Sequence, residues 1–271
     1  MMRVWYQSLV DGGRMPPYFE GLKARAAQVA RPGVEVDFHG MPAETYGGRT
    51  PADVAVYPYM MSLHTQFILD NALRAQAEGY DVFAVGSIQD PALELARSLV
   101  DLPVVGYGES AMHFACCLGS RFAVLAFAAG FGQMMDLRIR DLGLRERALP
   151  TLVIDVGFDD VGRALQEPAA LVEVFGEAAR RAIAQGAEAL IPGQLYLSEA
   201  IARASLTRID EVPIVDGLAA TLKMAEAMHD MKRLGISVTR RGYTHARPPQ
   251  DMIDHARRLH GRPPISTKKG G

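Results

Sequence analysis

The sequence predicts an α/β protein of two pseudo-symmetric lobes, each a parallel sheet flanked by helices, with a cleft between the lobes. Two observations support this fold class. Short apolar segments alternate with longer amphipathic segments along most of the 271 residues, and this alternation is typical of parallel sheets covered by helices on both faces. In addition, one strand–loop–helix–strand pattern occurs once in each half of the chain, as expected when two lobes share a topology.

The first half of the chain contains four expected strands, which are short, apolar and bounded by turn-forming residues. These strands are Arg3–Leu9, Val34–Phe38, Asp81–Val85 and Pro103–Val105. Pro16 and the proline after it suit the first turn of a helix, where a missing N–H costs little. A second helix has apolar residues at helical spacing over Ser62–Glu78 and ends at Gly79. Gly40–Tyr59 is expected to be a long functional loop, and Asp90 to cap the helix that follows the third strand.

The second half continues the same alternation. Its expected strands are Arg121–Phe127, Thr151–Val156, Ala187–Ile191 and Pro213–Val215. Its expected helices are one that begins near Glu109, then Gly132–Leu142, Val161–Ala184 and Leu218–Lys232. The tail Gly261–Gly271 is polar and rich in Pro and Gly, so we expect it to be disordered.

The repeat locates a candidate site. Two glycines seven positions apart bound a strand in each half, at Gly79–Gly86 and at Gly186–Gly193. In both copies a helix and then a short Pro-apolar-Val strand follow. The repeat therefore places Ser87 and Gln194 at equivalent strand ends. Because ligands of open α/β sheets bind at the carboxyl ends of strands, we expect the two loops to face one cleft.

Composition excludes several classes of function. A formal net charge of -2 gives no basic surface for nucleic acid or an anionic membrane, and the apolar runs are too short to cross a bilayer, so we expect a cytoplasmic protein. The two cysteines, Cys116 and Cys117, are adjacent and form no disulfide framework. The seven histidines show no metal-ligand spacing, so we expect no metal. Gly106–Ala111 fits the dinucleotide pattern G-x-G-x-x-A, but the next strand ends without the required acidic residue.

Four segments resemble a known family. Gly79–Pro91 resembles the hydantoin racemase motif Gly-Tyr-Asp-(apolar)-Gly-Cys-x-x-Asp-Pro. Pro103–Ala111, Leu118–Val124 and Pro213–Ala220 resemble its Pro-Val-Val-Gly-x-x-Glu-Ala, Leu-Gly-x-Arg-Phe-x-Val and Pro-Val-Val-Asp-Gly-x-x-Ala segments. The similarity runs from about residue 3 to about residue 232. The chain is thus similar to the aspartate/glutamate/hydantoin racemase superfamily, and to hydantoin racemases in particular.

The resemblance implies two pseudo-symmetric lobes with the active site between them, no cofactor, and a homo-oligomer. From the two loops, which lead into helix N-termini, we expect a small-molecule carboxylate or cyclic amide as the ligand. We expect residues 1–110 and 216–245 to form lobe one, residues 111–215 to form lobe two, and residues 246–271 to be a partly disordered extension. In the family a cysteine follows the glycine of each lobe. One thiolate removes a proton next to a carbonyl, and the other thiol returns one from the opposite face.

The chain departs from that pattern at both cysteine positions, which hold Ser87 and Gln194. The family's N-terminal Asn-Pro turn is also replaced, by Tyr6–Ser8. A serine hydroxyl needs an adjacent base before it reacts, and a glutamine amide does not transfer protons usefully, so the two-cysteine mechanism is not available. Cys116 and Cys117 are expected to pack within a helix.

The candidate site residues come from the two loops and their surroundings. As catalytic candidates we take Ser87, Gln194 and Tyr196. As substrate-binding candidates we take Gln7, Ser8, Tyr59, Gly86, Ile88, Glu109, Gly193 and Leu195. Helix N-termini after both loops, the second capped by Ser198, would suit a carboxylate or a developing oxyanion.

Each titratable candidate also has a structural interpretation. Tyr196 is either a general acid or a packed tyrosine, and Glu109 can simply complement the dipole of the helix it begins. His64 is expected to be a surface or capping residue, and His113 a packed helix residue. Tyr57 is a further candidate acid in the long loop.

Three functions remain open. The first is a cofactor-independent enzyme (isomerase, lyase or hydrolase) that acts on a small carboxylate, imide or lactam without cysteines. The second is a hydrolase of a cyclic amide, with Ser87 as nucleophile and Gln194 in the oxyanion hole. The third is a non-catalytic small-molecule binding protein. A titratable group within hydrogen-bond reach of Ser87 favours the enzymes, and a cleft without one favours the binding protein.

Overall fold

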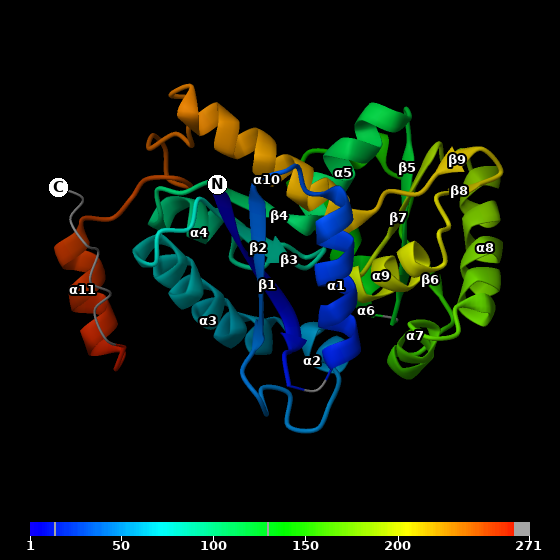
Figure 1. Ribbon diagram of the computed structural model, residues 1–271, viewed down its shortest axis with the longest axis horizontal. Coiled ribbons are helices and arrows are strands. Elements are labelled where there is room, and N and C mark those ends of the chain that lie inside the picture. The colour runs from blue at the N-terminus through cyan, green and yellow to red at the C-terminus, as the bar shows by residue number, and fades with distance from the viewer. Residues whose placement is uncertain (14, 129, 263–271) are drawn as a thin grey trace.

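The computed structural model describes residues 1–13, 15–128 and 130–262, and it shows two α/β lobes side by side (Figure 1). The first lobe holds a parallel sheet of order β2-β1-β3-β4, and the second a parallel sheet of order β6-β5-β7. The strands of the first sheet are β1 Met2–Asp11, β2 Val34–Met41, β3 Val82–Gly86 and β4 Val104–Gly106. Those of the second are β5 Phe122–Phe127, β6 Leu152–Ile154 and β7 Ala189–Pro192. The predicted fold class is confirmed.

Helices cover both sheets. Those up to the middle of the chain are α1 Pro16–Val29, α2 Pro51–Ala55, α3 Pro58–Ala77, α4 Leu93–Leu99 and α5 Tyr107–Leu118. The later ones are α6 Gly130–Asp141, α7 Phe158–Ala164, α8 Ala169–Ala184, α9 Leu195–Arg203, α10 Gly217–Arg233 and α11 Gln250–Leu259. A 3-10 turn at Arg145–Arg147 and a two-stranded hairpin, β8 Arg208–Ile209 with β9 Val212–Pro213, complete the elements.

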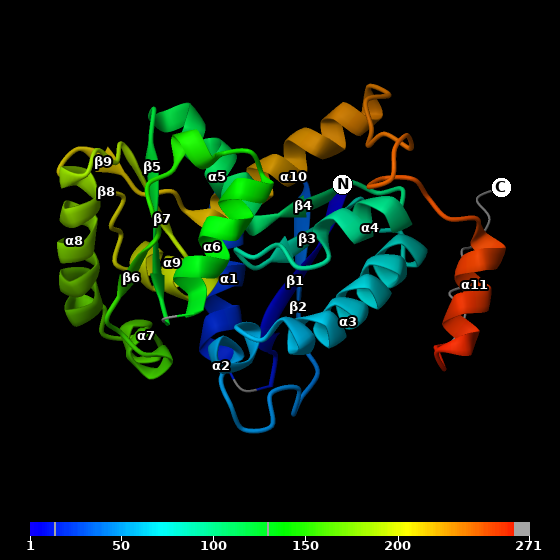
Figure 2. The same cartoon turned by 180° about the vertical axis from the view of Figure 1, so that it is seen from behind.

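The two lobes use the same local topology. In lobe one, β3 leads through α4 to β4, which pairs in parallel with β3. In lobe two, β7 leads through α9 to Ile214, which forms a parallel bridge with Leu190. A helix follows each unit, α5 in one case and α10 in the other, and these two helices pack against each other. Seen from behind, α5 and α10 lie next to each other where the lobes meet (Figure 2).

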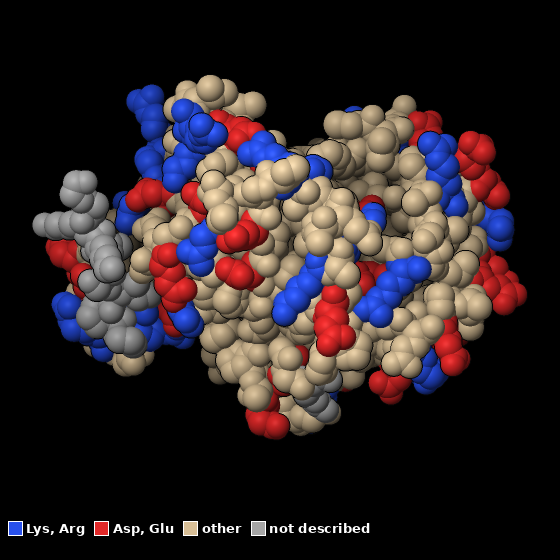
Figure 3. Space-filling view, in the orientation of Figure 1, with Lys and Arg blue, Asp and Glu red and all other residues tan. Residues whose placement is uncertain are grey.

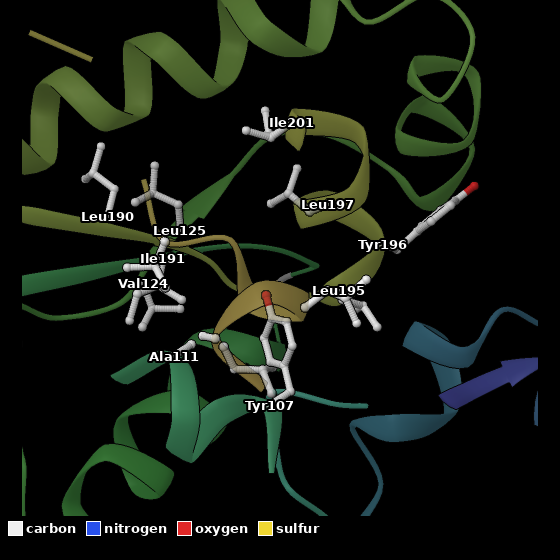
Figure 4. Packing of buried hydrophobic residues seen from close by; sticks show 14 of the residues in the cluster. Tyr107, Ala111, Val124, Leu125, Leu190, Ile191, Leu195, Tyr196, Leu197 and Ile201 are labelled. Carbon is white, nitrogen blue, oxygen red and sulfur yellow. The ribbon is translucent and has the colours of Figure 1, made fainter. Parts of the chain in front are cut away.

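One apolar core runs through both lobes, and Tyr107 connects the two lobes within it (Figure 4). The buried Tyr107 hydroxyl donates to the Pro192 carbonyl oxygen over 2.7 Å, which ties the start of α5 to the end of β7. A Cβ at Gly217 would lie 1.9 Å from the Tyr107 ring. Glycine is therefore required where α10 begins, because any larger residue would push α10 away from the ring.

Asp90 does not cap α4, contrary to prediction. Its backbone φ is 48°, and its carboxylate accepts from the N–H groups of Gly108 and Glu109 over 2.8 and 2.7 Å. It also pairs with Arg138 over 2.9 Å. Asp90 therefore caps α5 and joins it to α6. A Cβ at Gly106 would lie 2.3 Å from the Asp90 carboxylate, so the Gly-x-Gly pattern reflects this close approach.

Other expected boundaries were also wrong. The predicted helix Val161–Ala184 is two helices, because Pro168 lacks the N–H that a continuous helix needs. The predicted loop Gly40–Tyr59 contains α2, whose first turn is closed by reciprocal hydrogen bonds between Thr50 and Asp53. The hairpin β8–β9 and helix α11 were not predicted.

The C-terminal segment is fastened to lobe one by arginines. Arg257 and Arg262 both pair with Asp70 on α3, and α11 lies at the outer side of that lobe (Figure 1). The predicted disordered tail lies, from residue 263, outside the described residues. Within the part that the structure describes, no helix is both long and apolar enough to cross a membrane. The predicted lobe boundaries stay predictions.

Candidate active site

A cavity of about 70 Å³ lies between the loops that follow β3 and β7. The carboxyl ends of β1, β3 and β5 and the start of α9 form its walls, together with α2 and the loop before it. Among the residues that line it are Ser8, Leu9, Val10, Tyr18, Tyr46, Ala55, Met61, Gly86, Ser87, Ile88, Gln89, Phe127, Phe131, Phe158, Gln194, Leu195 and Tyr196. The two loops that the repeat singled out therefore meet at one site.

The loop of lobe one presents a free hydroxyl. β3 ends at Gly86, where a Cβ would lie 2.2 Å from the ring of Tyr6, so only glycine fits there. Ser87 follows and is half-buried. Across the described residues its hydroxyl has no hydrogen-bond partner, whether base or acceptor. α4 begins only at Leu93, so the helix N-terminus that we expected directly after this loop is not at the cavity.

The loop of lobe two is built differently, because the Gln194 side chain is used structurally. Its Nε2 donates to the Phe127 carbonyl oxygen over 2.6 Å, and its Oε1 accepts from the Phe127 N–H over 3.2 Å. This amide thus continues the β5–β7 hydrogen bonding beyond the end of β7. One N–H of Gln194 and its oxygen serve the main chain, its second N–H remains for a ligand, and the expected place of Gln194 in an oxyanion hole stays a prediction.

α9 begins immediately after Gln194, with Leu195 as its first residue. Ser198 was predicted to cap this helix, but it lies inside α9, and its hydroxyl accepts from the Gly217 N–H over 3.3 Å. The first-turn N–H groups of α9 therefore lie at the cavity without a side-chain cap. They form the positive end of a helix dipole, which favours a carbonyl or oxyanion of a ligand.

Three tyrosines contribute to the walls. Tyr196 stacks on Phe158 at 4.7 Å between ring centroids, and its side chain points away from Leu197 and Ile201 (Figure 4). Its hydroxyl lies against α7, because a Cβ at Gly162 would be 2.6 Å from that oxygen. Burial raises the pKa of Tyr196 to about 12. The Tyr18 hydroxyl lies 3.5 Å from Ser8 Oγ, and the Tyr46 hydroxyl donates to the Leu9 carbonyl oxygen.

The described residues give the cavity an uncharged lining. Its lining, as far as the chain is described, contains no Asp, Glu, Lys, Arg or His side chain. Aromatic and aliphatic groups dominate, with three kinds of polar group among them: serine hydroxyls, tyrosine hydroxyls and glutamine amides. A buried charge without a partner is costly, so this site suits an uncharged ligand with several hydrogen-bonding atoms.

Four predicted binding residues lie outside the cavity. Gln7 is buried behind it, where its side chain binds Asn71, Trp5 and the carbonyl oxygens of Ser8 and Gly40. Tyr59 is 73% exposed on α3. Glu109 lies in the first turn of α5, as its structural interpretation suggested, and it also forms a two-bond ion pair with Arg97. Gly193 is buried, and its N–H donates to the Leu125 carbonyl oxygen over 2.7 Å.

The structure also shows where the remaining histidine, tyrosine and cysteine candidates lie. Tyr57 and His113 are exposed, so His113 is not the packed helix residue that we expected. His64 is only 7% exposed, so its assignment as a surface or capping residue was wrong. It lies on the inner face of α3, which begins four residues earlier than predicted. Cys116 and Cys117 lie near the end of α5, and only Cys116 contacts the core.

Sequence reasoning missed the aromatic walls, namely Tyr18, Tyr46, Phe127, Phe131 and Phe158. Tyr46 had one available signal, because it lies in the long Gly- and Pro-rich loop that we expected to be functional. The others come from α1, β5, α6 and α7. Nothing local distinguishes them from ordinary core aromatics.

A larger hollow of about 560 Å³ lies on another face, between α1 and α9 (Figure 3). It holds charged side chains that pair with one another, Arg25 with Asp216 and Arg203 with Glu199. Burial raises the pKa of Glu199 despite Arg203. No group of three or more potential metal ligands occurs in the part of the chain that is described.

Comparisons with known proteins identify a family of similar sequences. A family model described as Asp/Glu/Hydantoin racemase matches residues 17–225. The hydantoin racemase of Pseudomonas sp. (strain NS671) is 30% identical over 182 residues, which are 67% of this chain and 71% of that protein. The hydantoin racemase of Rhizobium meliloti is 27% identical over 157 residues, 57% of this chain and 63% of that protein.

Solved structures show the same fold. Allantoin racemase from Klebsiella pneumoniae superposes with a TM-score of 0.75 at 23% identity, covering 92% of this chain and 94% of its own. Allantoin racemase from Pseudomonas fluorescens superposes with a TM-score of 0.71 at 23% identity, and the match covers 91% of this chain and 97% of that protein. The family model covers most of the chain, and the hydantoin racemase of Pseudomonas sp. is 30% identical over 67% of it, so this chain belongs to the Asp/Glu/hydantoin racemase family.

Proposed function

We propose that this chain is a cofactor-independent enzyme that acts on a small, uncharged cyclic amide of the hydantoin type, by a mechanism without cysteine. The observation that carries the proposal is the cavity between Ser87 and the N-terminus of α9, whose lining holds no charged side chain among the described residues. A cyclic amide offers carbonyl oxygens and ring N–H groups without a formal charge. Similarity to hydantoin racemases supports the same substrate class.

The arrangement suits stabilisation of a developing oxyanion. When a proton leaves the carbon next to a ring carbonyl, the electron pair moves to that carbonyl oxygen. The Ser87 hydroxyl is free to donate a hydrogen bond to it, and the first-turn N–H groups of α9 offer further donors. Donors already oriented toward developing charge commonly contribute about 2.7–4 kcal/mol each to lowering the barrier.

A serine hydrolase is less well supported. Ser87 has neither an imidazole nor a carboxylate as hydrogen-bond partner in the described parts of the chain, and a serine needs such a base to attack an amide. A non-catalytic binding protein is the second candidate, because no charged or imidazole side chain from the described parts of the chain lines the cavity. We expect a homo-oligomer and a cytoplasmic location, and both stay predictions.

Proton NMR in D₂O tests the proposal with 5-substituted hydantoins, allantoin and ring-opened N-carbamoyl amino acids, against an enzyme-free blank. Protein-dependent loss of the C5 proton signal supports the enzyme. Ring opening without exchange supports the hydrolase, and line broadening without any reaction supports the binding protein. Ser87→Val should slow exchange at least tenfold, whereas Ser98→Val, on the outside of α4, should not change it.

A further inference from the structure

The cavity of about 70 Å³ is bounded by side chains from both lobes. The wall most suited to movement is the segment from residue 42 to residue 56, which contains Tyr46 and α2.

Two features make this segment movable. Gly47 and Gly48 follow Tyr46 directly, with φ values of 54° and 84°, and a Cβ at either would meet open space. Much of the loop around them is exposed. The segment meets lobe two through apolar contacts, in which Ala52, Ala55 and Val56 pack with Ala126, Ala128 and Phe131. A rotation at the glycines that moves Tyr46 breaks these contacts and the hydrogen bond from the Tyr46 hydroxyl to the Leu9 carbonyl oxygen.

A buried imidazole lies directly behind Tyr46. The ring of His64 is 5.5 Å from the ring of Tyr46, at an interplanar angle of 85°. His64 lies one turn along α3 from Met61, which lines the cavity. Its Nδ1 is buried and has no hydrogen-bond partner among the described residues. A buried polar atom without a partner is destabilising, so this arrangement calls for a functional explanation.

We infer that His64 is the proton-transfer group of this site and that it meets the substrate when Tyr46 swings aside on Gly47 and Gly48. The inference rests on the proposed function. Neutral Nδ1 takes the proton from the carbon next to the ring carbonyl, so the C–H bond breaks and an N–H bond forms. The electron pair moves onto the carbonyl oxygen beside Ser87. The imidazolium exchanges its proton with solvent and returns one to the same carbon.

This chemistry differs from that of two opposed thiols. A single base that lies on one face of the ring returns the proton to the face it came from. Deuterium should therefore enter the substrate faster than its configuration inverts. Burial lowers the pKa of His64, which keeps the imidazole in the neutral, proton-accepting form at neutral pH.

The test is D₂O exchange of one enantiomer of a 5-substituted hydantoin, followed by NMR for deuterium and by chiral chromatography for inversion. Wild-type protein should exchange at least several-fold faster than it inverts. His64→Gln should lower exchange at least a hundredfold, in line with general acid–base contributions of about 10²–10⁴, while line broadening still reports binding. His113→Gln, at an exposed position on α5, is the matched control. Exchange by His64→Ala should recover when free imidazole is added.

Each outcome supports or contradicts the assignment of His64 as the base or the proposed enzyme. If wild-type and His64→Gln proteins exchange equally fast, His64 is not the base, although the proposed enzyme stands. If wild-type protein exchanges nothing, the enzyme and this inference both fail. Circular dichroism of each variant separates lost chemistry from lost folding. Imidazole rescue provides a second check, since a purely structural role would not respond to it in this way.

Discussion

Gln194 completes the sheet of lobe two by pairing its side-chain amide with both main-chain groups of Phe127. This position holds a cysteine in the motif that the chain resembles, so a residue type associated there with proton transfer is replaced by one that holds two strand ends together. The replacement accounts for a cavity whose two loops are similar in topology and different in chemistry.

Gln194→Ala should lower the free energy of unfolding by about 1–3 kcal/mol, because the buried N–H and C=O of Phe127 would lose their partners. Urea denaturation monitored by circular dichroism measures this change. Gln133→Ala, at an exposed site on α6, is the control and should shift stability by less than about 0.5 kcal/mol. Equal effects of the two substitutions would contradict the structural role of Gln194.

Asp90→Ala should be more damaging, at about 3–5 kcal/mol, because it removes the buried carboxylate that pairs with the Arg138 guanidinium and leaves that guanidinium only the more exposed Glu94. The Arg138 side chain is only 11% exposed, and α5 would also lose its cap. Thermal unfolding compares this variant with Asp141→Ala, whose pair with Arg140 is exposed on both sides. A melting temperature like that of the control would show that Asp90 does not join α5 to α6.

His64 and His39 contribute stability that should be lost as pH drops below neutral. Burial lowers the folded-state pKa of both His64 and His39. Near pH 6.5 the unfolded imidazoles therefore bind protons that the folded ones do not, and each pKa unit of difference costs about 1.4 kcal/mol below both values. Asp90 acts in the opposite direction, because burial raises its pKa to about 7, so the test compares wild-type protein with His64→Gln. Urea unfolding at pH 7.5 and pH 5.5 should show a smaller loss of unfolding free energy in His64→Gln than in wild-type protein. A larger loss in that variant would contradict the assignment.

Restoring the thiols should change the stereochemical outcome. Ser87→Cys combined with Gln194→Cys places a titratable group in each loop, as in the motif that the chain resembles. The double variant should invert a 5-substituted hydantoin at a rate comparable to its deuterium exchange, whereas either single variant should not. Chiral chromatography together with NMR in D₂O distinguishes these cases. Inversion by Ser87→Cys alone would show that a second acid already lines the opposite face.

Much of the scaffold could be predicted because its signals are local. Buried parallel strands are short apolar runs, and Gly79 ends α3 through a positive φ of 77°. The repeat predicted that the Ser87 and Gln194 loops would meet, and the structure places them on one cavity.

What could not be predicted depends on partners that are distant in the chain. Asp90 resembles a local helix cap, but its donors lie on α5 and α6. A glutamine beside a strand gives no sign that it will bind the main chain of Phe127. The burial of His64 follows from α3 beginning at Pro58 and from Tyr46 folding over it. Neither is visible in the periodicity of the helix alone.

The most direct test of the account is the charge preference of the cavity. Isothermal titration calorimetry should compare a neutral 5-substituted hydantoin with its ring-opened N-carbamoyl amino acid, which carries a carboxylate. Because no charged side chain among the described residues lines the cavity, the neutral ring should bind at least tenfold more tightly, and Ser87→Val should weaken it. Tighter binding of the carboxylate, unaffected by Ser87→Val, would contradict the proposed site.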